Sequence, residues 1–216
     1  MLEKMDAFFE ARLHGYDAHM LADIAGAAEF YPATAALLPK EAGAKVLDLG
    51  CGTGLELEYY FAGNPAAHVT GIDLSEGMLA ALKEKFPDKA LSLVQASYFD
   101  CPLGEACFDA AVSVESLHHF TQTQKRALYG KLHAALKADG YFVLTDYFAP
   151  DDAYEQFYFG ELARLKALQG ISDEGFYHYD TPLTVAHETD ALLSAGFSRV
   201  EDRASWDATH ILIAYK

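Results

Sequence analysis

The sequence has few cysteines, few basic residues and no long apolar run. Its three cysteines form no CxxC pair, which indicates neither a disulfide framework nor a zinc site, so we expect reduced thiols. Sixteen Lys and Arg against 32 Asp and Glu give a net charge of −16, which repels a phosphate backbone and argues against nucleic acid as a partner. The opening stretch MLEKMDAFFEARLHG is charged throughout, and no apolar run is long enough to span a bilayer. We therefore expect a cytoplasmic protein without a membrane segment.

The amino-acid composition is that of a globular protein. The 216 residues are 51% apolar and 22% charged, which suits one domain with a sizeable core. Residues 1–40 lack a strand pattern and show helical spacing, so we expect an N-terminal helical cap on a main domain that spans 41–216. The sequence leaves the choice between a monomer and a homodimer open.

Short apolar runs alternate with segments of helical spacing. The runs span residues 44–49, 68–73, 91–94, 108–114 and 140–147. One helix is expected after Ser75, a plausible N-cap, and another after the capping-box pattern Thr121–Gln124, with Gly140 at its C-terminal cap. This alternation predicts an α/β fold, a doubly wound parallel sheet covered by helices on both faces.

The last third of the chain departs from simple alternation. Residues 148–180, rich in Tyr and Phe, form a helical insertion after the fifth strand, and we expect it to lie over the carboxyl ends of the strands as a lid. A helix over 184–195 is expected to end at Gly196. Two final strands, 197–203 and 209–216, are expected to join through residues 204–208.

The stretch VLDLGCGTG places Gly50, Gly52 and Gly54 between a buried strand and a helix. Glycines there let the backbone approach a ligand, and the helix offers free N–H groups. Asp73 ends the second strand, nineteen residues after Gly54, where an acid that grips a ribose is expected. The spacing G-x-G-x-G is neither the dinucleotide pattern G-x-G-x-x-G nor a P-loop. The pattern therefore suggests a nucleoside-containing cofactor of another kind.

VLDLGCGTG resembles the cofactor signature of the class I S-adenosylmethionine-dependent methyltransferases. GIDLSEGML, FDAAVSVESLHHF and LKADGYFVLTDY resemble later motifs of that family, over residues 40 to 216. The resemblance implies a Rossmann-like, seven-stranded, mostly parallel sheet with an antiparallel last strand. It also implies S-adenosylmethionine as cofactor and methyl transfer to a small-molecule acceptor. Three alternatives remain. One is a non-catalytic module that binds this cofactor, and another is a nicotinamide-dependent oxidoreductase, for which the glycine spacing is wrong and a Tyr-x-x-x-Lys pair is missing. The third is a methyltransferase whose acceptor is a protein or a nucleic acid, and the acidic charge argues only against nucleic acid.

The family motifs also imply which residues hold the cofactor. Asp48 and the turn backbone would hold its methionine end, and Asp73 would take the ribose hydroxyls. Ser97 stands where many relatives carry an Asp that contacts adenine, and Glu115 would lie near the methionine amino group. The full predicted set is Tyr16, Asp48, Gly50, Cys51, Gly52, Gly54, Asp73, Leu74, Met78, Ala96, Ser97 and Glu115.

Methyl transfer from a sulfonium is an in-line displacement, for which a protein mainly aligns the reactants and excludes water. A hydroxyl or protonated amine acceptor must also lose a proton, and His118 or His119, after the fourth strand, could take it. Adjacent side chains point apart, so both acting together is not expected; either could instead cap the strand or pack under the next helix. Tyr147, Tyr158 and His178 are candidate acceptor-binding residues. No metal is expected, because no recognisable ligand constellation accompanies the acidic residues near Asp146. The acceptor and the methylated atom stay open.

Overall fold

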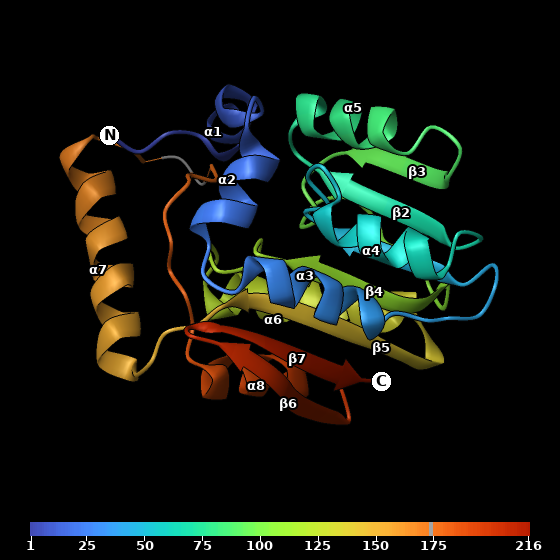
Figure 1. Cartoon of the computed structure of the whole chain (residues 1–216). Helices are drawn as coiled ribbons and strands as arrows, with labels where there is room; N and C mark the ends of the chain where they lie inside the picture. The colour runs from blue at the N-terminus through green and yellow to red at the C-terminus, as the bar shows by residue number, and fades with distance from the viewer. Residues whose placement is uncertain (173–174) are drawn as a thin grey trace.

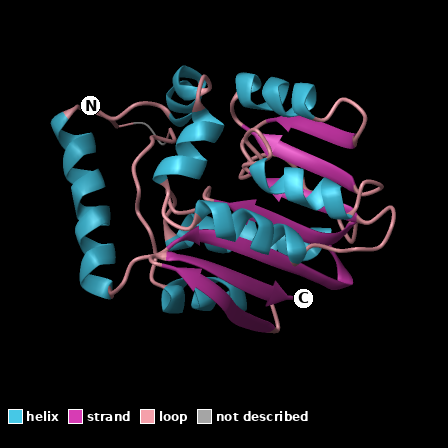
Figure 2. Cartoon of the chain, in the orientation of Figure 1, coloured by secondary structure: helices cyan, strands magenta, loops and turns pink. Residues whose placement is uncertain are grey.

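A seven-stranded sheet forms the centre of the protein in a computed structural model that describes residues 1–172 and 175–216 (Figures 1 and 2). The strand order is β3-β2-β1-β4-β5-β7-β6, and β7 alone runs antiparallel to its neighbours. The strands are β1 (Lys45–Leu49), β2 (His68–Asp73), β3 (Ala90–Gln95), β4 (Phe108–Val114), β5 (Leu136–Tyr147), β6 (Arg199–Trp206) and β7 (Thr209–Tyr215). The predicted doubly wound, mostly parallel sheet is confirmed.

Helices cover both faces of this sheet. Helices α3 (Ala27–Ala36), α4 (Leu55–Gly63) and α5 (Glu76–Lys85) share one apolar core with Val46 of β1, while α6 (Gln122–Ala135) and α8 (Val185–Ser194) share the other with Leu47. Successive residues of a strand point to opposite faces, which is why neighbours in β1 serve different cores. In the part of the chain that the structure describes, no helix is both long and apolar enough to cross a membrane.

Several predicted helix ends are confirmed by their hydrogen bonds. Ser75 Oγ accepts from the Met78 amide at 3.1 Å, and Thr121 and Gln124 form a reciprocal capping box. Gly196, with a φ of +111°, follows the end of α8. These local signals work because a cap satisfies amide or carbonyl groups that the helix leaves unpaired.

Two predicted boundaries are wrong. Gly140 does not cap α6, because that helix ends at Ala135 and the fully buried Leu136 turns extended and pairs with Phe108; Gly140 therefore lies inside β5. The last two strands are not joined through 204–208, because β6 continues to Trp206, which pairs with Thr209. Burial and strand pairing, which are tertiary effects, decide both ends.

The carboxyl ends of the parallel strands are covered by α1 (Met5–Arg12), α2 (Tyr16–Asp23) and the loop from residue 175 onward (Figure 1). The Met5 amide donates to the Phe176 carbonyl at 3.1 Å, and the His178 amide donates to the Glu3 carbonyl at 3.0 Å. Helix α7 (Asp152–Leu168) stands further out and buries none of its residues. Of the predicted insertion 148–180, the loop rather than the helix covers the strand ends, and residues 173 and 174 lie outside the described residues.

Candidate active site

The glycine turn between β1 and α4 has the backbone that the sequence predicts. Gly50, Gly52 and Gly54 have φ values of +73°, +47° and +72°, which favour glycine. A Cβ atom at Gly50 would also overlap the Ser116 side chain. The turn is pinned to β2, because the Gly50 amide donates to the Ile72 carbonyl at 2.8 Å. Glycine at position 50 is therefore required by both conformation and space.

Asp73 links the glycine turn to the next helix. Its Oδ2 accepts from the Gly52 amide and its Oδ1 from the Ser75 amide, both at 2.9 Å. Burial raises the pKa of Asp73, and these backbone hydrogen bonds oppose that rise without cancelling it. The carboxylate borders a small cavity of about 50 Å³. Of the predicted cofactor residues, this cavity is lined by Tyr16, Gly50, Gly52, Asp73, Leu74, Met78 and Glu115.

The remaining predicted cofactor residues lie outside that lining. Cys51 is buried against Gly71, and Ser97 Oγ accepts from the Phe99 amide at 3.2 Å. Gly54 precedes α4, and Ala96 packs at the edge of the core. Their predicted contact with the cofactor is a hypothesis that the geometry leaves untested.

Asp48 lies under the turn beside a residue that the sequence did not single out, Glu56 of α4. Both side chains are buried and the two carboxyls pair with each other, and among the described residues no other group hydrogen-bonds to the Asp48 oxygens or to Glu56 Oε1. Burial raises the pKa of both carboxyls, and the charge of Glu56 raises that of Asp48 further. An acid in the first turn of a helix is ordinary, so only its burial reveals Glu56. Buried carboxyl oxygens without a further donor are what a cationic or donor-bearing ligand group would satisfy.

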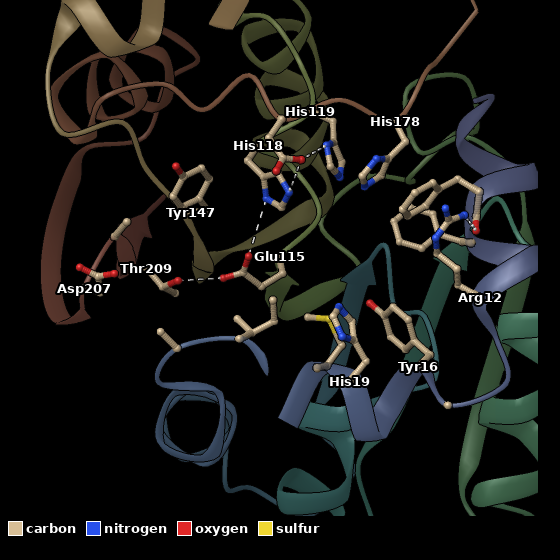
Figure 3. Close-up of a pocket in the computed structure, with 18 of the residues that line it drawn as sticks. Arg12, Tyr16, His19, Glu115, His118, His119, Tyr147, His178, Asp207 and Thr209 are labelled. Atoms are coloured by element: carbon tan, nitrogen blue, oxygen red, sulfur yellow. Dashed lines mark hydrogen bonds and ion pairs between the residues drawn. The ribbon is translucent and has the colours of Figure 1, made fainter. Parts of the chain in front are cut away.

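A second, larger cavity of about 770 Å³ adjoins the first (Figure 3). Helices α1 and α2, the loop after β4, the loop from residue 178 and the turn between β6 and β7 form its walls. Phe9, Tyr16 and Glu115 line both cavities. A ligand in the small cavity and a ligand in the large one would therefore meet at these three side chains.

His118 is fixed by a carboxylate from the neighbouring strand. Its Nδ1 lies 2.5 Å from Asp146 Oδ1, and Asp146 also accepts from the Leu117 and Tyr147 amides, both at 3.0 Å. Burial alone would lower the pKa of His118, but the charge and hydrogen bond of Asp146, with Asp180 and Glu115, raise it to about 9. His118 is therefore an imidazolium at neutral pH.

His119 has the opposite character. Burial and the charge of His118 lower its pKa, so the ring is neutral. Its Nδ1 lies 3.3 Å from both Asp180 Oδ1 and the Tyr179 carbonyl oxygen, and its other ring nitrogen is turned toward the cavity (Figure 3). A neutral imidazole that donates through Nδ1 presents Nε2 as a proton acceptor. Of the two predicted histidines, the geometry suits His119 for this task.

Glu115 occupies the boundary between the two cavities in a strained conformation. Its φ of +49° is uncommon outside glycine, and Thr209 Oγ1 donates to its Oε1 at 3.1 Å. Burial raises its pKa to about 7, although the charge of His118 lowers it. Its carboxyl therefore changes charge near neutral pH.

Only two of the three predicted acceptor-binding residues line the large cavity. Tyr147 and His178 line the large cavity, and the His178 ring stacks on Phe8 with the ring centroids 3.5 Å apart. Tyr158 does not line that cavity; its ring stacks on Tyr154 at 4.5 Å. Burial is the main cause that lowers the pKa of His178 to about 4.

Within the described part of the chain, two groups of side chains have the composition of a metal site. Donor atoms of His118, His119 and Asp180 lie within 4.8 Å of one another, as do those of Glu115, His118 and Asp146. Both groups contain His118, and its positive charge accounts for the carboxylates around it. Its Nδ1 faces Asp146, and its Nε2 lies 3.6 Å from Oδ1 of Asp180. The arrangement therefore fits a hydrogen-bonded proton holder.

Comparison with known proteins points to one enzyme family. Residues 46–140 match the family model described as a methyltransferase domain. An uncharacterized methyltransferase of Synechocystis sp. is 36% identical over 51% of this chain and 50% of its own length. The carboxy-S-adenosyl-L-methionine synthase of Campylobacter concisus is 28% identical over 84% of this chain and 80% of its own. The chain thus spans about half the length of the Synechocystis relative.

A solved structure extends the likeness to the whole fold. The S-adenosylmethionine-dependent methyltransferase from Mesorhizobium loti superposes with a TM-score of 0.62 at 22% identity. The match covers 86% of this chain and 96% of that one. The glycine turn, the sheet order and the helical layers are therefore those of a known class of fold.

Proposed function

Because the chain belongs to the class I S-adenosylmethionine-dependent methyltransferases, we propose that it transfers a methyl group from S-adenosylmethionine to a small molecule held in the large cavity. The observation that carries this proposal is the junction of the two cavities at Phe9, Tyr16 and Glu115. One cavity lies on the glycine turn, and the other contains a neutral histidine. An acceptor and a cofactor placed in them would face each other across that junction.

The residues of the small cavity fit the cofactor of this family. Asp73 would accept hydrogen bonds from the ribose, and the Gly50 and Gly52 backbone leaves room for close approach. The buried carboxyls of Asp48 and Glu56 lie outside the lining of this cavity and would supply negative charge near the cofactor's ammonium group. The cofactor supplies a methyl group on a positively charged sulfur. The side chains of Phe9 and Tyr16 restrict this cavity to about 50 Å³, so residues 1–40 would act as a cap that moves to admit the ligand.

At the acceptor end, His119 would take the proton of the nucleophile, and His118 would hold its charge beside Asp146 without exchanging it. The apolar rings of α1 would exclude water from the reacting groups. A cytoplasmic location agrees with the three free cysteines, because reducing compartments keep thiols unpaired. The cofactor-binding module without catalysis is the competing function, and it has no use for a neutral histidine in the large cavity.

The first test is calorimetric titration with S-adenosylmethionine, S-adenosylhomocysteine and NAD, of the native protein, Asp73→Ala and the control Asp88→Asn. Asp88 is exposed after α5, away from both cavities. We expect both sulfur nucleosides to bind, NAD not to bind, and Asp73→Ala alone to lose affinity. Binding of NAD in preference would overturn the proposal. Binding without methylation of any compound in a broad acceptor screen would favour the non-catalytic module.

A further inference from the structure

The large cavity is rich in carboxylates and aromatic rings and poor in available positive charge. Resting on the proposed function, we propose that the methyl acceptor is an amine, bound as its ammonium ion and carried on an apolar body.

Among the residues that the structure describes, three carboxyl groups reach this cavity from separate segments of the chain. Asp180 leaves 46% of its side chain exposed, and Asp207, in the turn after β6, has no hydrogen-bond or ion-pair partner among the described residues. Glu115 is the third. Burial would raise the pKa of Asp180, but the hydrogen bond with His119 and the nearby imidazoles lower it well below its usual range. Asp180 therefore keeps its negative charge throughout the physiological range.

The positive groups at the cavity are already paired. Arg12 is the single Lys or Arg among the described lining residues, and its guanidinium lies 3.2 Å from Glu3, donates to the Phe8 carbonyl at 3.0 Å and covers the Phe8 ring. His118 is held between Asp146 and Asp180. An acceptor with a carboxylate or phosphate would therefore lose its hydration here without gaining a partner, which disfavours it strongly.

The remaining wall suits a cation with an apolar body. Tyr16, Tyr147 and Trp206 present aromatic rings, which attract an ammonium group through their faces, and Met20 and Ile24 supply aliphatic surface. A cavity of about 770 Å³ lies in the range that holds a drug-sized molecule. The net charge of −16 adds a long-range attraction for cations.

The same cavity wall contains a group that can take the proton of the ammonium acceptor. The ammonium gives one proton to His119 Nε2, and the freed nitrogen lone pair forms the new bond to the methyl carbon. The carbon–sulfur bond breaks with its electron pair left on sulfur, so the products are a methylated ammonium ion and an uncharged thioether. His119 then returns its proton to solvent. Asp180, at 3.3 Å from His119 Nδ1, stabilises the imidazolium that forms in between.

The test uses a panel of arylalkylamines, each with its alcohol and carboxylate counterpart, beginning with 2-phenylethylamine, 2-phenylethanol and 3-phenylpropanoate. Binding to the protein saturated with S-adenosylhomocysteine is measured by calorimetry, and methylation with S-adenosylmethionine by mass spectrometry. We expect the amines to bind at least about tenfold more tightly than their counterparts, as a charge-assisted hydrogen bond requires. We also expect methylation at the amine nitrogen.

Asp180→Asn and Asp207→Asn should each lower the binding affinity for the amines about tenfold and leave the affinity for the alcohols nearly unchanged. The control Asp88→Asn should change neither affinity. Melting curves check that every variant is folded. Preferred methylation of alcohols or carboxylates, or no binding by any amine of the panel, overturns the amine assignment while leaving methyl transfer intact. Failure of S-adenosylmethionine itself to bind overturns both proposals.

Discussion

Asp146 Oδ1 lies 2.5 Å from His118 Nδ1, and this one contact gives two adjacent histidines opposite protonation states. The carboxylate keeps His118 charged, and the charge of His118 in turn helps to keep His119 neutral. A charged imidazole has no free acceptor atom, so of these two histidines only His119 is able to accept a proton. The two residues therefore cannot be interchanged, although they are neighbours in the sequence.

The first prediction concerns the pH profile of methylation. His119→Gln should lower kcat about 10²- to 10⁴-fold, the usual contribution of a positioned base. In the native enzyme, kcat/KM should fall as the pH drops below the lowered pKa of His119, which lies below the ordinary 6.5. Initial rates across the acidic range measure both effects. Unchanged turnover in His119→Gln with an identified acceptor would remove the base from the mechanism.

The second prediction concerns stability. The pKa of His118 is raised from 6.5 to about 9, so its ion pair contributes fully below pH 6.5 and is lost as the pH rises through 9. The advantage of the native protein over His118→Gln should shrink by about 3 kcal/mol across that interval. Urea unfolding at both ends of the interval measures it. An advantage independent of pH would show that Asp146 does not bind a proton-bearing ring.

The third prediction separates stability from ligand binding at the buried carboxyls. Glu56→Gln removes a buried carboxyl whose charge raises the pKa of the buried Asp48, so it should stabilise the ligand-free protein by about 1 kcal/mol. The same change should weaken S-adenosylmethionine binding, because an ammonium loses a charged partner. Thermal melting and calorimetry give the two values. A variant less stable than the native protein would contradict this account.

The fourth prediction concerns a buried ion pair between α6 and α8. Lys125 Nζ lies 2.5 Å from Glu188 Oε2, both side chains are buried, and Tyr129 donates to the same carboxylate. Lys125→Met alone leaves that carboxylate without its cation and should cost about 3–5 kcal/mol, and Lys125→Met with Glu188→Leu should recover much of it. Arg164→Ala, which breaks the exposed pair with Glu161, is the control and should cost less than about 1 kcal/mol. Equal losses in the single and double variants would argue against this interpretation.

The fifth prediction is that no metal takes part. The charged His118 ring hydrogen-bonds to Asp146 through Nδ1, and its Nε2 lies 3.6 Å from Asp180; because an imidazolium carries a proton on each nitrogen, neither offers a lone pair. Dialysis against EDTA should therefore leave methylation unchanged. Lost activity that Mg²⁺ or Zn²⁺ restores would assign the His118, His119 and Asp180 group to an ion instead.

The sequence predicts those features that depend on neighbouring residues. The glycine turn, the Ser75 cap and the capping box at Thr121 each arise within a few residues, and each is observed. The contact between Asp146 and His118 joins residues 28 positions apart in the sequence. Leu136 leaves the helical conformation after α6 because it pairs with Phe108 of β4. Such contacts depend on the packed sheet. For this reason the prediction of Gly140 as a helix cap was wrong, and Glu56 and Asp180 were not predicted as site residues.

Three side chains, Phe9, Tyr16 and Glu115, border both cavities. A residue that touches two ligands makes their affinities interdependent, and the effect must be equal in both directions. The sulfonium of the cofactor and the ammonium of the proposed acceptor, placed on either side of Glu115, would compete for the same carboxylate. The loss of charge at sulfur during methyl transfer would end that competition. The wall between the cavities would thus act as a thermodynamic link, through which methyl transfer relieves the competition for Glu115 that the two substrates impose on each other.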